Sequence, residues 1–172
     1  LADAQLYGLK TCFFSDTFAA YRRDALDEIG GFDPDAMVNE DTLAAARLLQ
    51  AHKRIGYCAE ACVYHSHDYT LRQDFRRYFD VGAFHGRYPW IRETFGNAEG
   101  EGLRFVRSEL TYLRTHAPQS IPSALVRTPL KWLAYKLGAN YTKLPHSPLK
   151  DLHYLNHHRN TTPYRSTKDL RY

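Results

Sequence analysis

The N-terminal part of this chain alternates between aromatic-rich, strand-like runs and segments with helical spacing, and this alternation restricts the fold more than any other feature. Residues 11–21 (TCFFSDTFAAY) combine aromatic and β-prone side chains and predict a buried strand. Residues 22–29 then predict a short helix, which Gly30 and Gly31 follow where a helix is expected to end.

The alternation continues along the next segments. Residues 42–51 have apolar side chains at helical spacing, residues 54–67 contain two short strand-like runs, and helical spacing returns from Thr70. Strands and helices that alternate along a chain are typical of α/β folds. We therefore expect an α/β fold for residues 1–100.

The second part of the chain has a different pattern. Residues 103–116 and 125–137 each have apolar positions on one helical face, and prolines interrupt the rest. We expect residues 101–172 to form a helical, basic extension that is poorly ordered after Asn156.

Length and cysteine content exclude several classes of protein. A chain of 172 residues is long enough for one domain with a buried core. Its three cysteines, Cys12, Cys58 and Cys62, lack CxxC spacing, which argues against a disulfide framework or a cysteine-ligated zinc site and for buried thiols in a reducing compartment. No stretch approaches the roughly 18 consecutive apolar residues of a membrane-spanning helix. Because the chain begins at Leu1, we expect it to be part of a longer protein.

The net charge of +4 is unevenly distributed. From Arg127 onward, nine Lys and Arg residues stand against two Asp residues, a net charge of +7, which leaves the preceding part at −3. The helix over residues 125–137 carries Trp132 beside Lys131 and Lys136, which suits an anionic membrane surface. A helix packed on the body with its lysines in solvent explains the same pattern.

Asn39-Glu40-Asp41 has two interpretations. Asn is a favoured N-cap residue, and carboxylates in the first turn interact favourably with the helix dipole, so a structural role is sufficient by itself. A catalytic base needs the same setting, a carboxylate fixed at the end of a rigid element beside a cleft.

Other polar groups are equally open to two interpretations. His65 and His67 point to the same side of an extended segment and suit metal ligation, although two histidines fall short of a complete site. Asp33 and Asp35 have the letters of a DxD metal motif, but they stand in a loop where Asp and Pro commonly form turns.

An arginine-rich segment follows these histidines. Arg76, Arg77 and Asp80 lie in QDFRRYFD, which fits either a solvated helix face or a phosphate-binding edge.

The order of these pieces is more specific than any one of them. FFSDTFAAYRRDALDEIGGFDPD, then NED, then IGYCAEACVYHSHDYTLRQDFRRYFDVGAFH resembles the second half of the catalytic domain of family 2 glycosyltransferases. Within that family the chain is most similar to bacterial rhamnosyltransferases that use dTDP-L-rhamnose. The resemblance is close over residues 7–85 and looser around LKWLAYKLGANYTKLP.

The resemblance implies a GT-A type, Rossmann-like fold and a role for each matching residue. Asp41 would be the general base, and Glu40 would orient it or contact the acceptor. His65, with His67 as the second choice, would complete a site for a divalent cation, Mg²⁺ or Mn²⁺. The remaining positions would bind the donor diphosphate or the acceptor: Arg76, Arg77, Asp80, Ser15 and Asp16.

The resemblance also implies a reaction and its partners. An inverting transfer would move a sugar, L-rhamnose, from a nucleoside-diphosphate sugar to a glycan or lipid-linked acceptor in cell-surface polysaccharide (O-antigen) synthesis. The enzyme would be cytoplasmic, at the inner face of the cytoplasmic membrane. Nothing in the sequence matches the nucleotide-binding half of such enzymes or its DxD ligands, so we expect this stretch alone to be inactive.

Two alternatives belong to other classes of protein. The basic arm with its Tyr, Trp and His residues would suit a nucleic-acid-binding module, which would leave the acidic body unexplained. A small metal-binding module built on His65, His67 and a carboxylate would lose its fold on chelation.

Overall fold

The computed structural model describes residues 4–36, 38–96 and 101–143, and in these ranges all regular structure is helical. The N-terminal part contains α1 (Ala4–Tyr7), the 3-10 helices η1 (Gly8–Cys12) and η2 (Asp16–Phe18), α2 (Arg23–Glu28) and α3 (Glu40–Gln50). Then follow α4 (Leu71–Arg87), α5 (Pro89–Phe95), α6 (Glu101–His116), η3 (Pro118–Ser120), α7 (Ile121–Ala139) and η4 (Tyr141–Lys143).

The predicted helices are confirmed, and local sequence explains where they begin and end. Thr70 and Gln73 form a capping box at the start of α4. Gly30 and Gly31 end α2 with φ values of 81° and 76°, and the Gly31 N–H donates to the carbonyl of Leu26. Such left-handed residues are the usual way to satisfy the last carbonyls of a helix.

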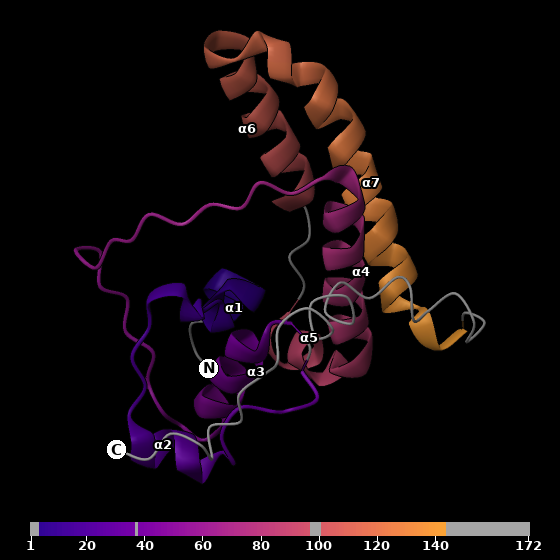
Figure 1. Ribbon diagram of the computed structural model, residues 1–172. Coiled ribbons are helices and arrows are strands. Elements are labelled where there is room, and N and C mark those ends of the chain that lie inside the picture. The colour runs from indigo at the N-terminus through magenta and orange to yellow at the C-terminus, as the bar shows by residue number, and fades with distance from the viewer. Residues whose placement is uncertain (1–3, 37, 97–100, 144–172) are drawn as a thin grey trace, which may run out of the picture.

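The predicted strands are wrong for the described residues. Residues 11–21 form part of η1, then η2 and extended backbone, and residues 53–70 have no regular structure. Figure 1 shows the second segment as a long extended connection between α3 and α4. A strand requires a neighbour that supplies ladder hydrogen bonds, and within the described ranges no segment pairs with either run. The expected α/β fold is therefore seen here only in its helices.

A core lies where α3 packs against η1, α5 and the second half of α4. Its buried members come from segments far apart in sequence: Cys12, Val38, Leu43, Ala45, Ala46, Phe84, Ile91 and Phe95. Cys12 is a buried thiol as expected, whereas Cys58 and Cys62 are exposed, because the segment that carries them packs against little.

Helices α4 and α7 lie side by side and run in the same direction (Figure 1). Their backbones approach so closely that a Cβ at Gly82 would collide with the carbonyl oxygen of Tyr135, and one at Gly138 with that of Phe79. Small residues at such a contact let two helices meet without a layer of side chains.

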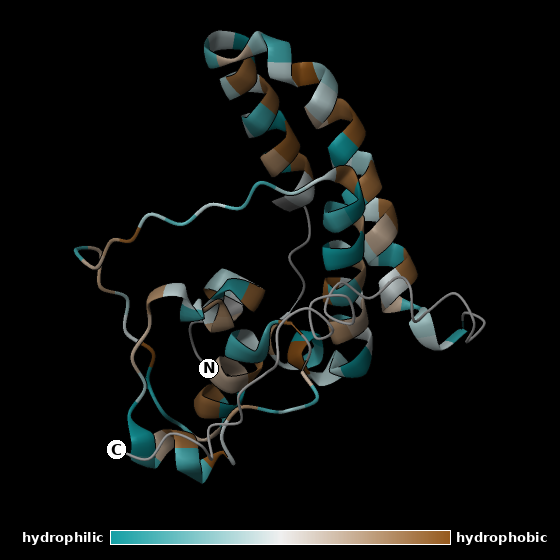
Figure 2. Ribbon diagram, in the orientation of Figure 1, coloured by the Kyte–Doolittle hydropathy of each residue, from teal (hydrophilic) through white to brown (hydrophobic). Residues whose placement is uncertain are grey.

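Helices α6 and α7 form a hairpin, of which α6 and the start of α7 project beyond α4 while the rest of α7 lies along α4 (Figure 1). Both are longer than expected, and Pro129 lies inside α7. Figure 2 shows hydrophobic positions along both helices. None of the helices in the described ranges is long and apolar enough to cross a membrane. Residues after Asn156, expected to be poorly ordered, lie outside the described residues.

Candidate active site

The start of α3 brings together the carboxylates predicted to carry the chemistry. Asn39 precedes the helix in a left-handed conformation, with φ 57° and ψ 29°, and its side chain caps no backbone N–H. The structural explanation for Asn39 therefore lacks its characteristic hydrogen bond. The backbone carbonyl of Asn39 instead accepts from the Leu43 N–H at 3.0 Å.

Asp41 is held at both carboxylate oxygens. Its Oδ1 accepts from the backbone N–H of Thr42 at 2.6 Å, and its Oδ2 accepts from the backbone N–H of Asp16 at 3.3 Å. Two N–H donors restrict the carboxylate to one orientation while it remains half-buried, not enclosed. Such an arrangement suits a group that must accept a proton from a ligand.

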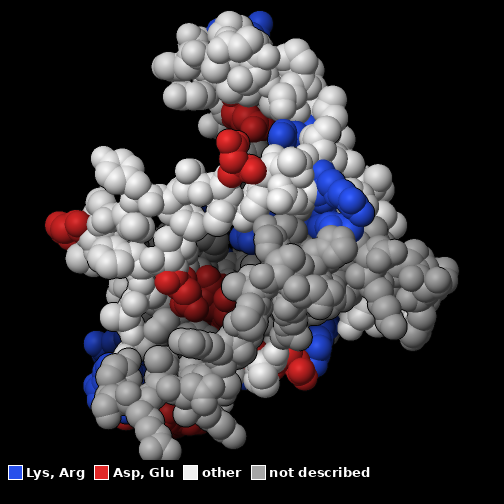
Figure 3. All heavy atoms as spheres, viewed as in Figure 1, with Lys and Arg blue, Asp and Glu red and all other residues white. Residues whose placement is uncertain are grey.

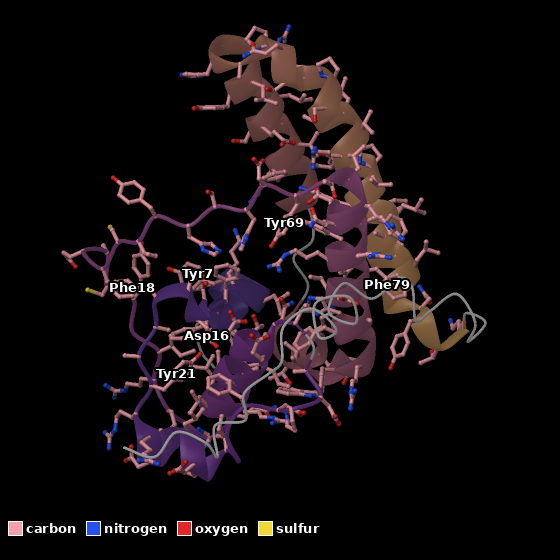
Figure 4. The ribbon with its side chains drawn as sticks, in the orientation of Figure 1. Tyr7, Asp16, Phe18, Tyr21, Tyr69 and Phe79 are labelled. Atoms are coloured by element: carbon pink, nitrogen blue, oxygen red, sulfur yellow. The ribbon has the colours of Figure 1, made fainter. Side chains whose placement is uncertain are left out.

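The side chain of Asp16 is held by a tyrosine. The hydroxyl of Tyr21 donates to Asp16 Oδ1, and Figure 4 shows both residues beside α3. Ser15, predicted to bind a ligand, stabilises this turn: its Oγ donates to Thr17 Oγ1 at 3.0 Å and accepts from the Thr17 N–H.

Three carboxylates therefore share a small volume, those of Asp16, Glu40 and Asp41. Burial raises the pKa of Glu40, and the charges of Asp41 and Asp16 add to the increase, while its backbone hydrogen bond and Arg77 oppose it. Burial is also the largest cause of the raised pKa of Tyr21, and the hydrogen bond to Asp16 raises that pKa further. Figure 3 shows acidic side chains gathered over the region where Figure 4 labels Asp16.

The structure separates the three predicted residues of α4. Arg77 is half-buried, acts electrostatically on Glu40, and lies over the ring of Tyr69 at 5.8 Å. Arg76 and Asp80 are buried, with 7% and 2% of their surface exposed, so of the three residues Arg77 is the one whose side chain is partly in solvent. On a helix, consecutive residues point about 100° apart. Which of these directions faces a neighbouring element, and is therefore buried, cannot be predicted from the spacing alone.

His65 and His67 lie side by side, as their i and i+2 spacing predicts, although their segment is not a strand. Their rings meet edge to face with centroids 4.3 Å apart, and His67 stacks on Tyr69 at 4.9 Å. Both are exposed, and the described residues include no group of three or more His, Cys, Asp or Glu side chains that could hold a metal. Two imidazoles alone do not complete a cation site.

The DxD letters at Asp33 and Asp35 correspond to structural carboxylates. Asp33 forms an ion pair with Arg47 on α3 at 2.7 Å and accepts from the Tyr88 hydroxyl at 3.3 Å. Asp35 pairs with Arg87 on α4 at 2.9 Å. Each carboxylate is thus neutralised by an arginine, which fits the loop interpretation.

A family model described as glycosyl transferase family group 2 matches residues 4–152. The chain belongs to this family. It is 47% identical over 169 residues, 98% of its length, to the O-antigen chain rhamnosyltransferase WbaN of Salmonella anatum. It is 45% identical over 170 residues, 99% of its length, to the O-antigen chain rhamnosyltransferase RfbN of Salmonella typhimurium.

These comparisons confirm the family inferred from the motifs. The chain spans 54% of the length of each of these two relatives. No solved structure matches the chain significantly.

Two residues beside these candidate residues of the family 2 chain, Tyr21 and Tyr69, were not predicted from the sequence. Tyr21 contacts Asp16 five positions earlier, across a 3-10 turn and extended backbone, and the Tyr69 ring contacts both His67 and Arg77. The contacts of Tyr21 with Asp16 and of Tyr69 with Arg77 follow no helix or strand period, whereas Tyr69 stands two positions after His67, a spacing that could have linked these two rings.

Proposed function

We propose that the complete polypeptide carrying this sequence is an inverting glycosyltransferase in which Asp41 is the general base. The observation that supports this most is the Asp41 carboxylate, oriented by the Asp16 and Thr42 N–H groups at the start of α3 in a family 2 chain. In this reaction Asp41 takes the proton of the acceptor hydroxyl. The acceptor oxygen bonds to the anomeric carbon of the donor sugar while the bond from that carbon to the diphosphate breaks.

The neighbouring residues have distinct roles in this proposal. Glu40, whose pKa burial raises, contacts the acceptor beside Asp41. Arg77, whose guanidinium lies near Glu40 and over Tyr69, faces the negative charge that develops on the leaving diphosphate. A divalent cation would supply further charge neutralisation there, with His65 or His67 among its ligands and the others from outside the described residues.

The donor and acceptor follow from the relatives. Both are named O-antigen chain rhamnosyltransferases, so we take an activated L-rhamnose, dTDP-L-rhamnose, as donor and a growing lipid-linked glycan as acceptor. Transfer of radiolabelled sugar to membranes from dTDP-L-rhamnose, compared with UDP-glucose and GDP-mannose, tests this. Transfer from either of the other donors at the same rate would contradict the assignment. Nothing found in the comparisons favours a nucleic-acid-binding function.

We also propose that residues 54–67 form strands of a GT-A sheet in the complete enzyme. Phe13 and Tyr57 are 75% and 94% exposed, and both line a hollow of about 860 Å³ beside α3. Aromatic side chains left in solvent on extended backbone suit packing against further chain. Hydrogen exchange tests this: amides of residues 54–67 should be protected in the complete polypeptide and exchange rapidly in residues 1–172 alone.

We further propose that the hairpin of α6 and α7 contacts the cytoplasmic face of an anionic membrane. Its exposed apolar residues come from both helices: Leu103, Phe105, Tyr112, Leu125, Val126, Trp132 and Leu133. An apolar groove of about 730 Å³ lies between the helices, and Lys136 lies over the Trp132 ring at 5.8 Å. Aromatic side chains beside lysines are typical of helices that lie in a membrane interface.

A further inference from the structure

Tyr21 is linked through Asp16 to Asp41, which stands 25 positions after Asp16 in the sequence. Its hydroxyl donates to Asp16 Oδ1, and the backbone N–H of the same Asp16 donates to Asp41 Oδ2 at 3.3 Å. Asp16 is therefore held at its side chain by Tyr21 while its backbone holds Asp41. From these contacts we infer that Tyr21 is a positioning residue, which orients the Asp41 carboxylate through Asp16.

The ring of Tyr21 is itself fixed by two aromatic side chains. Phe14 packs against it with centroids 5.2 Å apart at 58°, and Phe32 meets it edge-on at 5.2 Å and 83°. Edge-to-face contacts of this kind restrict the rotation of a ring. Phe32 belongs to the GGFD stretch, which thereby acquires a specific role: it supports the tyrosine that supports Asp16.

The local backbone explains why Asp16 needs such support. Asp16 is exposed, and it begins η2, a single turn of three residues. So short a turn has few backbone hydrogen bonds of its own. Ser15 restrains the turn at one side through Thr17, and Tyr21 restrains it through the Asp16 carboxylate. Without the tyrosine hydroxyl, the turn and the N–H that it presents to Asp41 are free to shift.

This inference rests on the proposed function of Asp41 as the base, and two substitutions separate the contributions. Tyr21→Phe removes only the hydroxyl and keeps both ring contacts. Asp16→Ala removes the acceptor of that hydroxyl and keeps the backbone N–H that reaches Asp41. A hydrogen bond to a carboxylate contributes enough that we expect Tyr21→Phe to lower kcat about tenfold in the complete polypeptide. Donor affinity should change less than about twofold, because the base acts on the chemical step.

A double-mutant cycle distinguishes positioning from a general structural role. If Tyr21 acts through Asp16, adding Tyr21→Phe to Asp16→Ala should lower kcat no further, within about twofold. Tyr7→Phe, at a residue of α1 that is 62% exposed, is the matched control and should behave as the wild type. Thermal unfolding of each variant should show an intact fold.

The outcomes are distinct for the two proposals. Provided that Asp41→Asn is inactive, an unchanged kcat in Tyr21→Phe overturns the positioning role. So does a double variant whose loss of kcat equals the product of the two single losses. Full activity of Asp41→Asn overturns the proposed base, and the inference with it. A matching loss of kcat and of donor affinity in Tyr21→Phe would also contradict positioning, because it would indicate general distortion of the site.

Discussion

The half-buried Arg127 on α7 forms an ion pair with the buried Asp74 in the first turn of α4. The same guanidinium donates to the backbone carbonyl of Tyr69 at 2.8 Å, and Lys131 lies 3.6 Å from the Asp74 carboxylate. The hairpin of α6 and α7 thus contacts the backbone at Tyr69, whose ring in turn contacts His67 and Arg77. A surface proposed to meet the membrane thereby contacts the segment that carries residues proposed to act on the sugar.

Replacement of Asp41 by Asn should reduce kcat about 100-fold or more in the complete polypeptide, because the amide cannot accept the acceptor proton. Donor affinity, measured by calorimetry with dTDP-L-rhamnose, should stay within about threefold of the wild type. Asn39→Gly is the control for a helix-cap role, because glycine adopts the same left-handed backbone, and it should retain most activity, since the Asn39 side chain makes no cap hydrogen bond. Near-normal turnover of Asp41→Asn would rule out the base.

Gly82→Ala should destabilise the fold by about 3 kcal/mol or more, because its Cβ would meet the Tyr135 carbonyl of α7 and two backbones would have to separate. Gly102→Ala on α6 is the matched control: no atom lies near its Cβ. It should stabilise the helix by up to about 1 kcal/mol. Urea denaturation of residues 1–172 measures both, and equal effects would contradict the close contact of α4 and α7.

His85 should make the fold less stable as the pH falls. The pKa of His85 is lowered from 6.5 to about 4, mainly by burial and further by the positive charge of Arg92. The Nδ1 atom of His85 is buried without a hydrogen-bond partner. Between these values the unfolded chain binds a proton that the folded chain does not, so stability present above pH 6.5 is lost progressively towards pH 4. Between pH 7 and pH 5 the loss should be about 2 kcal/mol.

Urea denaturation at the two pH values tests this, with His85→Gln expected to remove most of the difference. His116→Gln, at an exposed position of α6, should leave it unchanged. A His85→Gln variant with the wild-type pH dependence would show that other groups cause the acid sensitivity.

For the metal, His65→Ala should raise the concentration of Mg²⁺ or Mn²⁺ needed for half-maximal activity, and His67→Ala should do so less. Loss of one protein ligand weakens cation binding while water fills the position. Tyr64→Phe, at an exposed position beside His65, is the control. Identical cation requirements in all three variants would exclude both histidines as ligands.

The hairpin should bind vesicles that contain anionic lipid and not neutral ones. A cation near such a surface contributes about 1 kcal/mol, so reversing the charge in Lys136→Glu should weaken binding on the order of tenfold. Trp132→Ser should weaken it through lost apolar contact. Arg23→Glu, on α2 at the far end of the molecule (Figure 1), is the charge-matched control. Co-sedimentation at low and high salt measures this, and equal binding to neutral vesicles would contradict it.

Several features could be predicted from the sequence because their hydrogen bonds are local. Helices α2, α3, α4, α6 and α7 follow apolar spacing, and the capping box at Thr70 and the glycine end of α2 depend on residues a few positions apart. The family, and with it the expectation for Asp41, came from the order of short motifs along the chain.

The tertiary structure decided what depends on distant partners. Residues 54–67 have strand-like composition, but a strand forms only when another segment supplies hydrogen bonds, and no described residue does. The burial of Arg76 and Asp80 follows from the contact of α4 with its neighbours, which helical spacing does not specify. The Asp16 N–H reaches Asp41 across 25 residues, and Tyr21 reaches Asp16 because Phe14 and Phe32 fix its ring. Those contacts exist only once the chain has folded, because they join groups that no local period brings together.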